Sequence, residues 1–407
     1  ISIIFFLISI IIFFSNNKLH PAKDKYLQIL FACITFIIFS NLNTIFLTRQ
    51  SSLIRNNLIW LDLFNWIPLF LIFISAQKYL QYKFQRLIFT RVLIAGTIPV
   101  LVSCALQYWF KIYGPFEIFN GLIVWFQKEL SSSEDGIAGL FSNSNYAGFW
   151  LSSVLPFVIT EQLTNKNILR KLILFILLFL FTYFIILTAS RNAFLGILIT
   201  LAFIFRKNIK YNLSFFLATI ISSSLFIYFN QKLLETNLTK SILEINLIKR
   251  LLFLDREWGY GNPFHRIDIY TNGLKLIRER PFWGYGPSSF QAISEMNEGS
   301  GDITHLHNFP LEIAFNYGIP LAIILTSLVS YLLIKSWTKI NLNRNLDYYF
   351  TTNISWFTAS FIVTFSHLLD VTYYDGKISI LIWIFLAGLK CIIEEDVNKS
   401  KSFKDIY

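Results

Sequence analysis

The chain has 407 residues, of which 55% are hydrophobic and only 14% are charged. Soluble globular proteins carry about 25% charged residues, so this composition excludes an ordinary soluble domain and indicates a membrane protein. The formal net charge of +11 could suggest a nucleic acid partner. Basic residues of membrane proteins usually set their orientation in the bilayer instead, and we predict no nucleic acid partner.

Apolar runs near the roughly 20 residues that cross a bilayer recur along the chain. They are continuous rather than alternating, which favours helices over the strands of a membrane barrel. With eleven visible spans and a cytoplasmic carboxyl tail, Ile1 would lie outside, so a cytoplasmic amino terminus would need one further span upstream. The fold class is therefore an all-α polytopic integral membrane protein with about 11 to 12 transmembrane helices. The predicted spans are Ile3–Phe14, Tyr26–Leu47, Leu58–Ala76, Leu87–Phe110, Tyr146–Thr160, Leu172–Leu187, Ala193–Phe205, Leu213–Phe229, Leu311–Ile334, Tyr349–Leu369 and Ile378–Ile392.

Lysine and arginine gather in alternate connections, for example Lys78 to Arg91 and Arg206 to Lys210. The positive-inside rule makes these connections, and the carboxyl tail, cytoplasmic. The one long polar stretch, residues 230–310, then forms a large outer loop, in which we expect short amphipathic helices. We divide the chain into transmembrane helices (1–138), a core that includes the loop (139–392) and a cytoplasmic tail (393–407).

The three cysteines, Cys33, Cys104 and Cys391, all fall within apolar runs. This placement indicates small core residues rather than a disulfide framework or a metal site. The outer loops contain no Asp-x-Asp sequence, and the chain has no Walker motif. We therefore predict neither a metal nor a nucleotide cofactor.

Arg191 stands between two predicted spans with scarcely any loop to carry it. It could be an interfacial anchor whose charge reaches the headgroups. We favour a functional role, because anchors of this kind are commoner on the cytoplasmic side and an outward arginine can hold a lipid phosphate with two hydrogen bonds.

Within the outer loop, His265, Arg266 and Asp268 precede an amphipathic stretch from Ile269 to Arg280. The stretch suits a helix that lies against the membrane or the bundle. Pro281 and the two glycines of a Gly-x-Gly sequence end it. We interpret that sequence as a tight turn, because it lacks the third glycine and the preceding strand of a phosphate-binding loop.

His305 and His307 lie just before the ninth predicted span. Residues at this spacing do not share a helical face, so they could ligate one metal only from an extended segment. One histidine acting as a base fits better, since the ordinary histidine pKa, about 6.5, suits deprotonation of a hydroxyl near neutral pH. A polar interfacial histidine is the alternative. Likewise, Asp370 and Tyr374 could contact sugar hydroxyls or could form a turn.

Five segments, in order along the chain, resemble the O-antigen ligase and O-antigen polymerase superfamily of bacterial inner membranes. The resemblance covers roughly Gly136 to Leu389. The first four predicted spans contain no motif that resembles the family. The matching segments are Gly139–Asn145, Leu187–Arg191, Arg266 with the helix that follows it, Glu279–Gly286 and His307–Gly318.

The resemblance implies glycosyl transfer at the periplasmic face, from a glycan on undecaprenyl diphosphate to an acceptor hydroxyl. The acceptor is lipid A-core in a ligase and another lipid-linked repeat unit in a polymerase. A diphosphate leaving group needs cations, and we expect Arg191 and Arg266 to supply them. His307 would take the acceptor proton in an inverting attack, with His305 in reserve. Residues expected to bind substrate are Asn143, Asn145, Ser190, Arg278, Arg280, His305, Asn308, Asp370 and Tyr374.

Two alternative hypotheses about the function remain. Related sequences transfer glycans to proteins, so the resemblance does not fix the acceptor. A transporter of a small anion or of a lipid carrier is a different class, and it predicts charged residues at mid-bilayer in broken helices. The predicted spans are nearly free of such charges. Membrane lipids are expected partners in every case.

Overall fold

The computed structural model describes residues 24–48, 60–121, 123–130, 135–205, 263–293, 304–342 and 347–396. The predicted spans Ile3–Phe14 and Leu213–Phe229 lie outside these residues, as do most of loop 230–310 and most of the tail. The chain forms two compact units. Unit 1 comprises Ile1–Tyr82, Trp258–Thr338 and His367–Tyr407, and unit 2 comprises Lys83–Glu257 and Lys339–Ser366. The predicted domain boundary after residue 138 falls within unit 2.

Helices dominate the described residues, and six stretches are long and apolar enough to cross a membrane. A seventh apolar helix, α8 (Arg191–Ile204), is shorter. The protein is therefore an all-α polytopic membrane protein, as predicted, while the total of about 11 to 12 spans stays a prediction. The six stretches are α2 (Lys25–Thr48), η1 (Trp60–Asn65) with α4 (Ile67–Leu80), α5 (Lys83–Trp109), α7 (Ile168–Leu187), α14 (Ile319–Leu342) and α16 (Gly376–Glu394).

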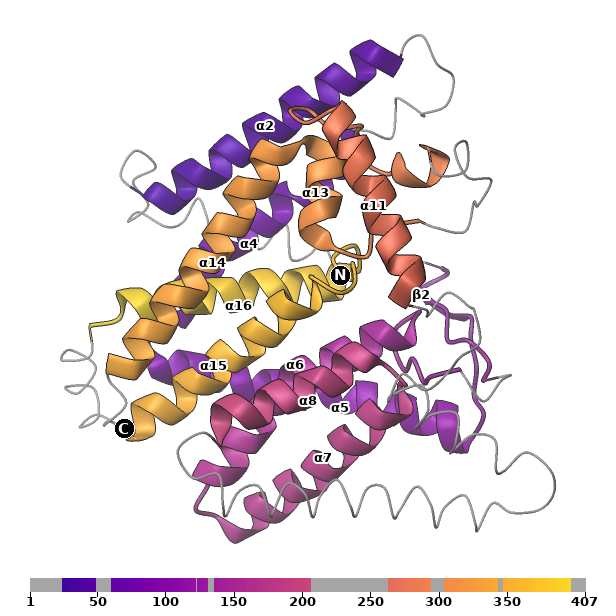
Figure 1. Ribbon diagram of the computed structural model, residues 1–407. Coiled ribbons are helices and arrows are strands. Elements are labelled where there is room, and N and C mark those ends of the chain that lie inside the picture. Colours follow the sequence, from indigo (N-terminus) through magenta and orange to yellow (C-terminus); the bar gives the residue numbers. More distant parts are fainter. Residues whose placement is uncertain are drawn as a thin grey trace. The chain divides into compact units, whose positions relative to one another are not determined.

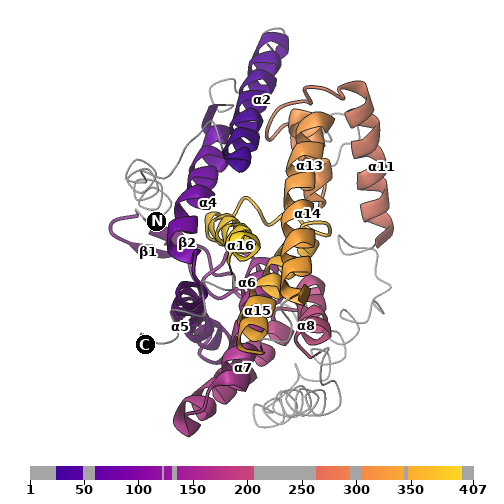
Figure 2. The same ribbon diagram turned by 90° about the vertical axis from the view of Figure 1, so that its left-hand side faces the viewer.

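In unit 1, α16 packs against α4, and α2 contacts both α4 and α13 (Phe309–Tyr317). The amphipathic helix α11 (Pro263–Glu279) runs alongside α13, as Figure 1 and Figure 2 both show. Lys390 of α16 is buried, and its ammonium donates to Gln77 of α4 (2.7 Å) and to Asp24 before α2 (3.1 Å). This paired charge ties the three helices together, because a buried ammonium is stable only with such partners.

In unit 2, α6 (Ser144–Thr164) is the central helix and packs against α7, α8 and α15 (Asp347–Ser366). Every residue of α6 from Ala147 to Glu161 is buried except Trp150. Small residues allow the close approach: a Cβ on Gly196 of α8 would lie 2.8 Å from Ser152 Cβ. Such contacts between small residues are the usual way in which membrane helices pack. A short antiparallel hairpin, β1 (Phe116–Ile118) and β2 (Ile123–Trp125), follows α5.

The three cysteines are buried and none of them forms a disulfide. Their burial confirms the prediction that they are core residues. Cys33 and Cys104 have no exposed surface, and Cys391 is 6% exposed.

Three predicted elements differ from the structure. The predicted span Leu58–Ala76 consists of the 3-10 helix η1 followed by α4. The predicted span Leu311–Ile334 is broken at Gly318 into α13 and α14, because Gly318 takes a left-handed conformation (φ 99°) that ends the first helix. The amphipathic helix begins at Pro263 rather than Ile269, so Arg266 lies within it. Proline suits the first turn of a helix, where its missing N–H would have no partner.

Gly318→Ala is expected to destabilise the protein. The added Cβ would lie 2.1 Å from Phe282 O, and the left-handed backbone alone costs an alanine on the order of 1 to 3 kcal/mol. The measurement is the thermal unfolding midpoint of the purified protein in detergent. Gly96→Ala is the control, because nothing lies within 4 Å of its Cβ. Equal midpoints for the two variants would contradict this account of the break between α13 and α14.

Candidate active site

Hydrogen bonds join two loops of unit 1, the loop that leads into α13 and the loop that precedes α16. Phe309 N donates to His367 O (2.8 Å), and Asn308 Nδ2 donates to Leu368 O (2.9 Å). The Asn308 side chain also caps α13 by accepting from a backbone N–H. These contacts hold His307 beside the second loop.

His307 forms a close pair with Asp370. Its Nδ1 lies 3.0 Å from Asp370 Oδ1, with the two side chains 36% and 12% exposed. The same carboxylate oxygen accepts from Val371 N (2.9 Å). His307 has a left-handed backbone (φ 50°), which is strained for a residue other than glycine. Such strain persists only where surrounding contacts impose it, and it is common at active sites.

The environment of Asp370 favours its ionised form. Burial, the largest single influence, raises the pKa of this carboxyl, while the hydrogen bond and charge of His307 lower it. The charge of Arg266 and the backbone hydrogen bond of Val371 act in the same direction, so the pKa lies below its usual range. An ionised carboxylate accepts a hydrogen bond from Nδ1–H, so in the neutral form of the imidazole the lone pair lies on Nε2. That tautomer is the one a general base requires.

Arg266 lies on α11 at the same place. Its guanidinium donates through Nη1 to Leu369 O (2.8 Å), directly before Asp370 in the chain. Tyr270, one turn further along α11, donates its hydroxyl to His307 O (3.3 Å). Arg266 is half-buried and has five N–H donors. It can therefore hold the loop and still present a positive charge to an anion.

Glu312 stabilises the backbone just before His307. This residue of α13 is 2% exposed, and its Oε2 accepts from the buried Leu306 N (2.9 Å). Its Oε1 accepts from Asn316 Nδ2 (3.4 Å). His305 Nδ1 lies 3.5 Å from Oε1, which is an ion-pair distance without hydrogen-bond geometry. Glu312 thus fixes the backbone of the residue before His307.

Glu312→Ala is expected to lower both stability and activity, and Glu312→Gln is expected to retain most of both. Alanine leaves the buried Leu306 N–H without an acceptor, which costs about 1 to 3 kcal/mol. The amide oxygen of glutamine can still accept that bond. Thermal unfolding and transfer rates of the two variants test this. An equal loss in both would mean that the charge, rather than the acceptor, matters.

An aromatic cluster of Trp66, Tyr373 and Phe309 lies next to the two loops. The Trp66 ring centroid is 5.2 Å from that of Tyr373, and Phe309 is 4.5 Å from Tyr373. Tyr373 also donates to Asn65 O (3.1 Å). Trp66 Nε1 donates to Tyr317 at the end of α13 (2.9 Å). This packing makes the loop before α16 a rigid support for Asp370.

Unit 2 gathers a second set of the predicted residues around the turn between α7 and α8. Ile137 N donates to Leu187 O (3.1 Å), and a Cβ on Gly136 would meet Thr188 O at 1.9 Å. Only glycine therefore fits this close approach between the segment before α6 and the turn. The buried Gln107 accepts from Ala138 N (2.9 Å) and from the next backbone N–H.

Arg191 is the first residue of α8 and is half-buried. Ser190 before it is 2% exposed and caps the helix by accepting from Ala193 N (3.4 Å). A helix amino terminus attracts anions through its free N–H groups and its dipole. Arg191 adds a full charge to that end.

The other predicted substrate-binding residues have individual surroundings. Asn143 is exposed and caps α6, with its side chain accepting from Asn145 N (2.8 Å). Arg278 is exposed on α11. Arg280 lies 4.5 Å from the Tyr285 ring.

Tyr374 stacks on His305, with the ring centroids 5.2 Å apart. Its hydroxyl accepts from Asn316 Nδ2 (3.3 Å). The predicted set misses Gln107, Glu312 and Tyr270. Their signal in the sequence is a polar residue inside or beside an apolar or amphipathic run.

In the part of the chain that the structure describes, no cluster of three or more His, Cys, Asp or Glu side chains could hold a metal ion. His305 and His307 also have different partners, Glu312 and Asp370.

Residues 175–326 match the family model described as O-antigen ligase. No curated protein matches the chain. The matched segment includes Arg191, Arg266 and His307. Over this segment, which is less than half of the chain, the protein is similar to the O-antigen ligase family.

Proposed function

We propose that the protein transfers a glycan from undecaprenyl diphosphate to a hydroxyl of lipid A-core. The proposed site faces the periplasm from a bacterial inner membrane, and the reaction inverts the anomeric carbon and uses no metal. The match of residues 175–326 to the O-antigen ligase family supports a ligase or polymerase acting on lipid-linked glycans. The observation that carries the proposed chemistry is the pairing of His307 with the ionised Asp370, beside Arg266.

In the proposed reaction, His307 Nε2 takes the proton of the acceptor hydroxyl. The acceptor oxygen attacks the anomeric carbon from the face opposite the diphosphate. A new glycosidic C–O bond forms as the bond to the diphosphate breaks, and the diphosphate leaves with the electron pair. Asp370 stabilises the imidazolium formed at His307, as a carboxylate beside a histidine base does in other enzymes.

Cations are needed where negative charge develops on the leaving diphosphate. Arg266 is the proposed cation of unit 1, and Arg191, at the amino terminus of α8, is that of unit 2. Arg278 and Arg280 on and after α11 are proposed to assist. A guanidinium suits this task because its N–H donors match two phosphate oxygens at once.

A polymerase that uses a second lipid-linked glycan as acceptor is the alternative, with the same proposed residues. The test supplies membranes with an undecaprenyl diphosphate-linked glycan and lipid A-core, and separates the products on a gel. Glycan on lipid A-core supports the ligase, and longer lipid-linked chains support the polymerase. Transfer to neither, by folded protein given several glycans, would contradict both.

A further inference from the structure

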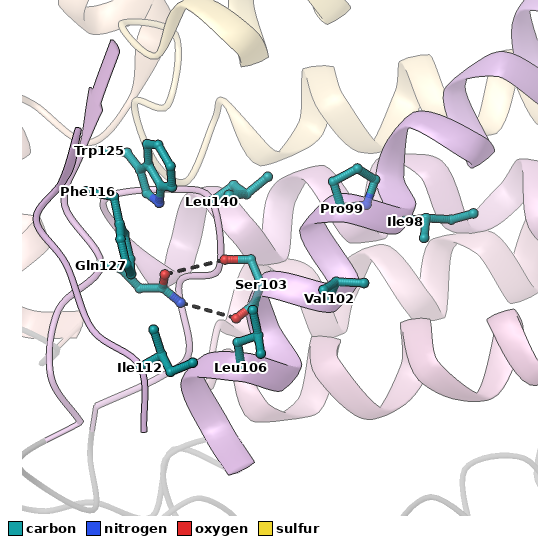
Figure 3. A pocket seen from close by; sticks show the side chains of 10 residues that line it. All are labelled: Ile98, Pro99, Val102, Ser103, Leu106, Ile112, Phe116, Trp125, Gln127 and Leu140. Carbon is teal, nitrogen blue, oxygen red and sulfur yellow. Dashed lines mark hydrogen bonds between the residues drawn. The ribbon is translucent and has the colours of Figure 1, made fainter. Parts of the chain in front are cut away.

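Unit 2 contains a groove that the proposed chemistry does not use. It lies between the second half of α5 and the β1–β2 hairpin, and its volume is about 470 Å³. Figure 3 shows Ile98 and Pro99 at one end and Phe116 and Trp125 at the other. Ile98, Val102 and Leu106 of α5 are 43%, 51% and 36% exposed, so the groove opens along the outer side of this helix.

The groove is apolar and its few polar side chains are mostly satisfied. Gln127 Nε2 donates to Ser103 O (3.2 Å), and Ser103 Oγ donates to Gln127 Oε1 (3.4 Å). Among the described residues that line it, none is charged. A charged ligand would lose its hydration here without gaining a partner, so the lining selects a hydrocarbon chain.

One donor in the lining is left without a partner. The indole Nε1 of Trp125 is buried and has no hydrogen-bond partner among the described residues. A buried tryptophan N–H usually finds an acceptor. Figure 3 shows this nitrogen on the edge of the ring that faces the other lining side chains. The occupant should therefore bring a single uncharged acceptor to the Trp125 end.

The two ends of the groove lie at different depths along a membrane span. α5 is long and apolar enough to cross the bilayer, and the groove follows its second half towards Tyr108 and Trp109. Tyrosine and tryptophan gather at the membrane interface. The apolar end at Ile98 is therefore deep in the hydrocarbon region, and Trp125 is near the level of the headgroups.

We propose that this groove binds one acyl chain of an ester-linked phospholipid, whose ester carbonyl accepts a hydrogen bond from Trp125 Nε1. In such a lipid the hydrocarbon chain ends at an ester carbonyl near the headgroup. In the groove, likewise, the apolar lining ends at the Trp125 N–H donor. A polyprenyl diphosphate matches less well. It has no neutral acceptor at the head of its chain, and its diphosphate would need cations that the described lining lacks.

The experiment uses the full chain in phosphatidylglycerol vesicles that contain a phosphatidylglycerol with a photoreactive diazirine on one acyl chain. Cross-linked peptides are identified by mass spectrometry. We expect labelling to concentrate on the second half of α5 and on the hairpin. Trp125→Phe keeps the apolar surface but removes the donor, and it should lower this labelling by about tenfold, the equivalent of one hydrogen bond.

Val102→Trp should block the groove and abolish the same labelling. Its matched control is Ile176→Trp on α7 of the same unit, since Val102 and Ile176 are both 51% exposed. If Val102→Trp does not fold, Trp125→Phe still decides. Labelling spread over all exposed apolar faces and unchanged in Trp125→Phe would overturn the proposal. Displacement of the probe by undecaprenyl phosphate, but not by excess phosphatidylglycerol, would also overturn it.

Discussion

Replacing His307 by alanine is expected to lower the turnover of glycan transfer by about 10²- to 10⁴-fold, the usual contribution of a general base. The loss should appear in kcat rather than in KM, because the base acts on the proton that moves in the transition state. The measurement is the initial rate of transfer in vesicles with purified protein. Thermal unfolding of the variant should stay close to that of the wild type.

His305→Ala is the matched comparison for His307, since it removes an imidazole two residues away that lies beside Glu312 instead of Asp370. We expect it to retain far more activity than His307→Ala. A rate for His307→Ala close to that of the wild type, together with loss in His305→Ala, would move the role of the base to His305.

Replacing Arg266 by alanine is expected to reduce kcat by about 10²- to 10³-fold, as the loss of one preorganised charge donor does in other enzymes. Arg266→Lys should recover only part of this. Lysine keeps the charge but cannot donate both to Leu369 O and, with a planar fork, to a diphosphate. The measurement is again the initial rate at saturating donor.

Lys275→Ala is the control for Arg266, because it removes one positive charge from an exposed position on the same helix. Its rate should stay close to that of the wild type. An equal loss in both variants would indicate a general effect of charge near the membrane rather than a specific contact with the leaving group.

Much of the fold is readable from the sequence, because membrane spans depend on local composition. The helices predicted near Tyr26–Leu47, Leu87–Phe110 and Leu172–Leu187 are α2, α5 and α7. The break at Gly318 is not readable, since glycine is common inside membrane helices. The structure adds the left-handed conformation of Gly318 and the close approach of Phe282 O, which together require glycine there.

The candidate site is less predictable than the spans. The sequence identifies His307 and Arg266 by residue type and position, but it predicts Asp370 as a sugar contact. The partnership of His307 and Asp370 joins residues 63 positions apart, and no local pattern encodes such a distance. The contact of Glu312 with the backbone of Leu306 cannot be predicted from the sequence for another reason. A carboxylate at the start of an apolar run gives no sign that it holds the backbone of Leu306.

The central claim is that His307 and Asp370 act as one unit, and a double-mutant cycle tests it most directly. The rates of glycan transfer are measured for the wild type, His307→Ala, Asp370→Asn and the double variant, each checked for thermal stability. We predict strong non-additivity: once His307 is absent, Asp370→Asn should cause no further loss, because the carboxylate acts through the imidazole. Losses that simply multiply in the double variant would contradict the account.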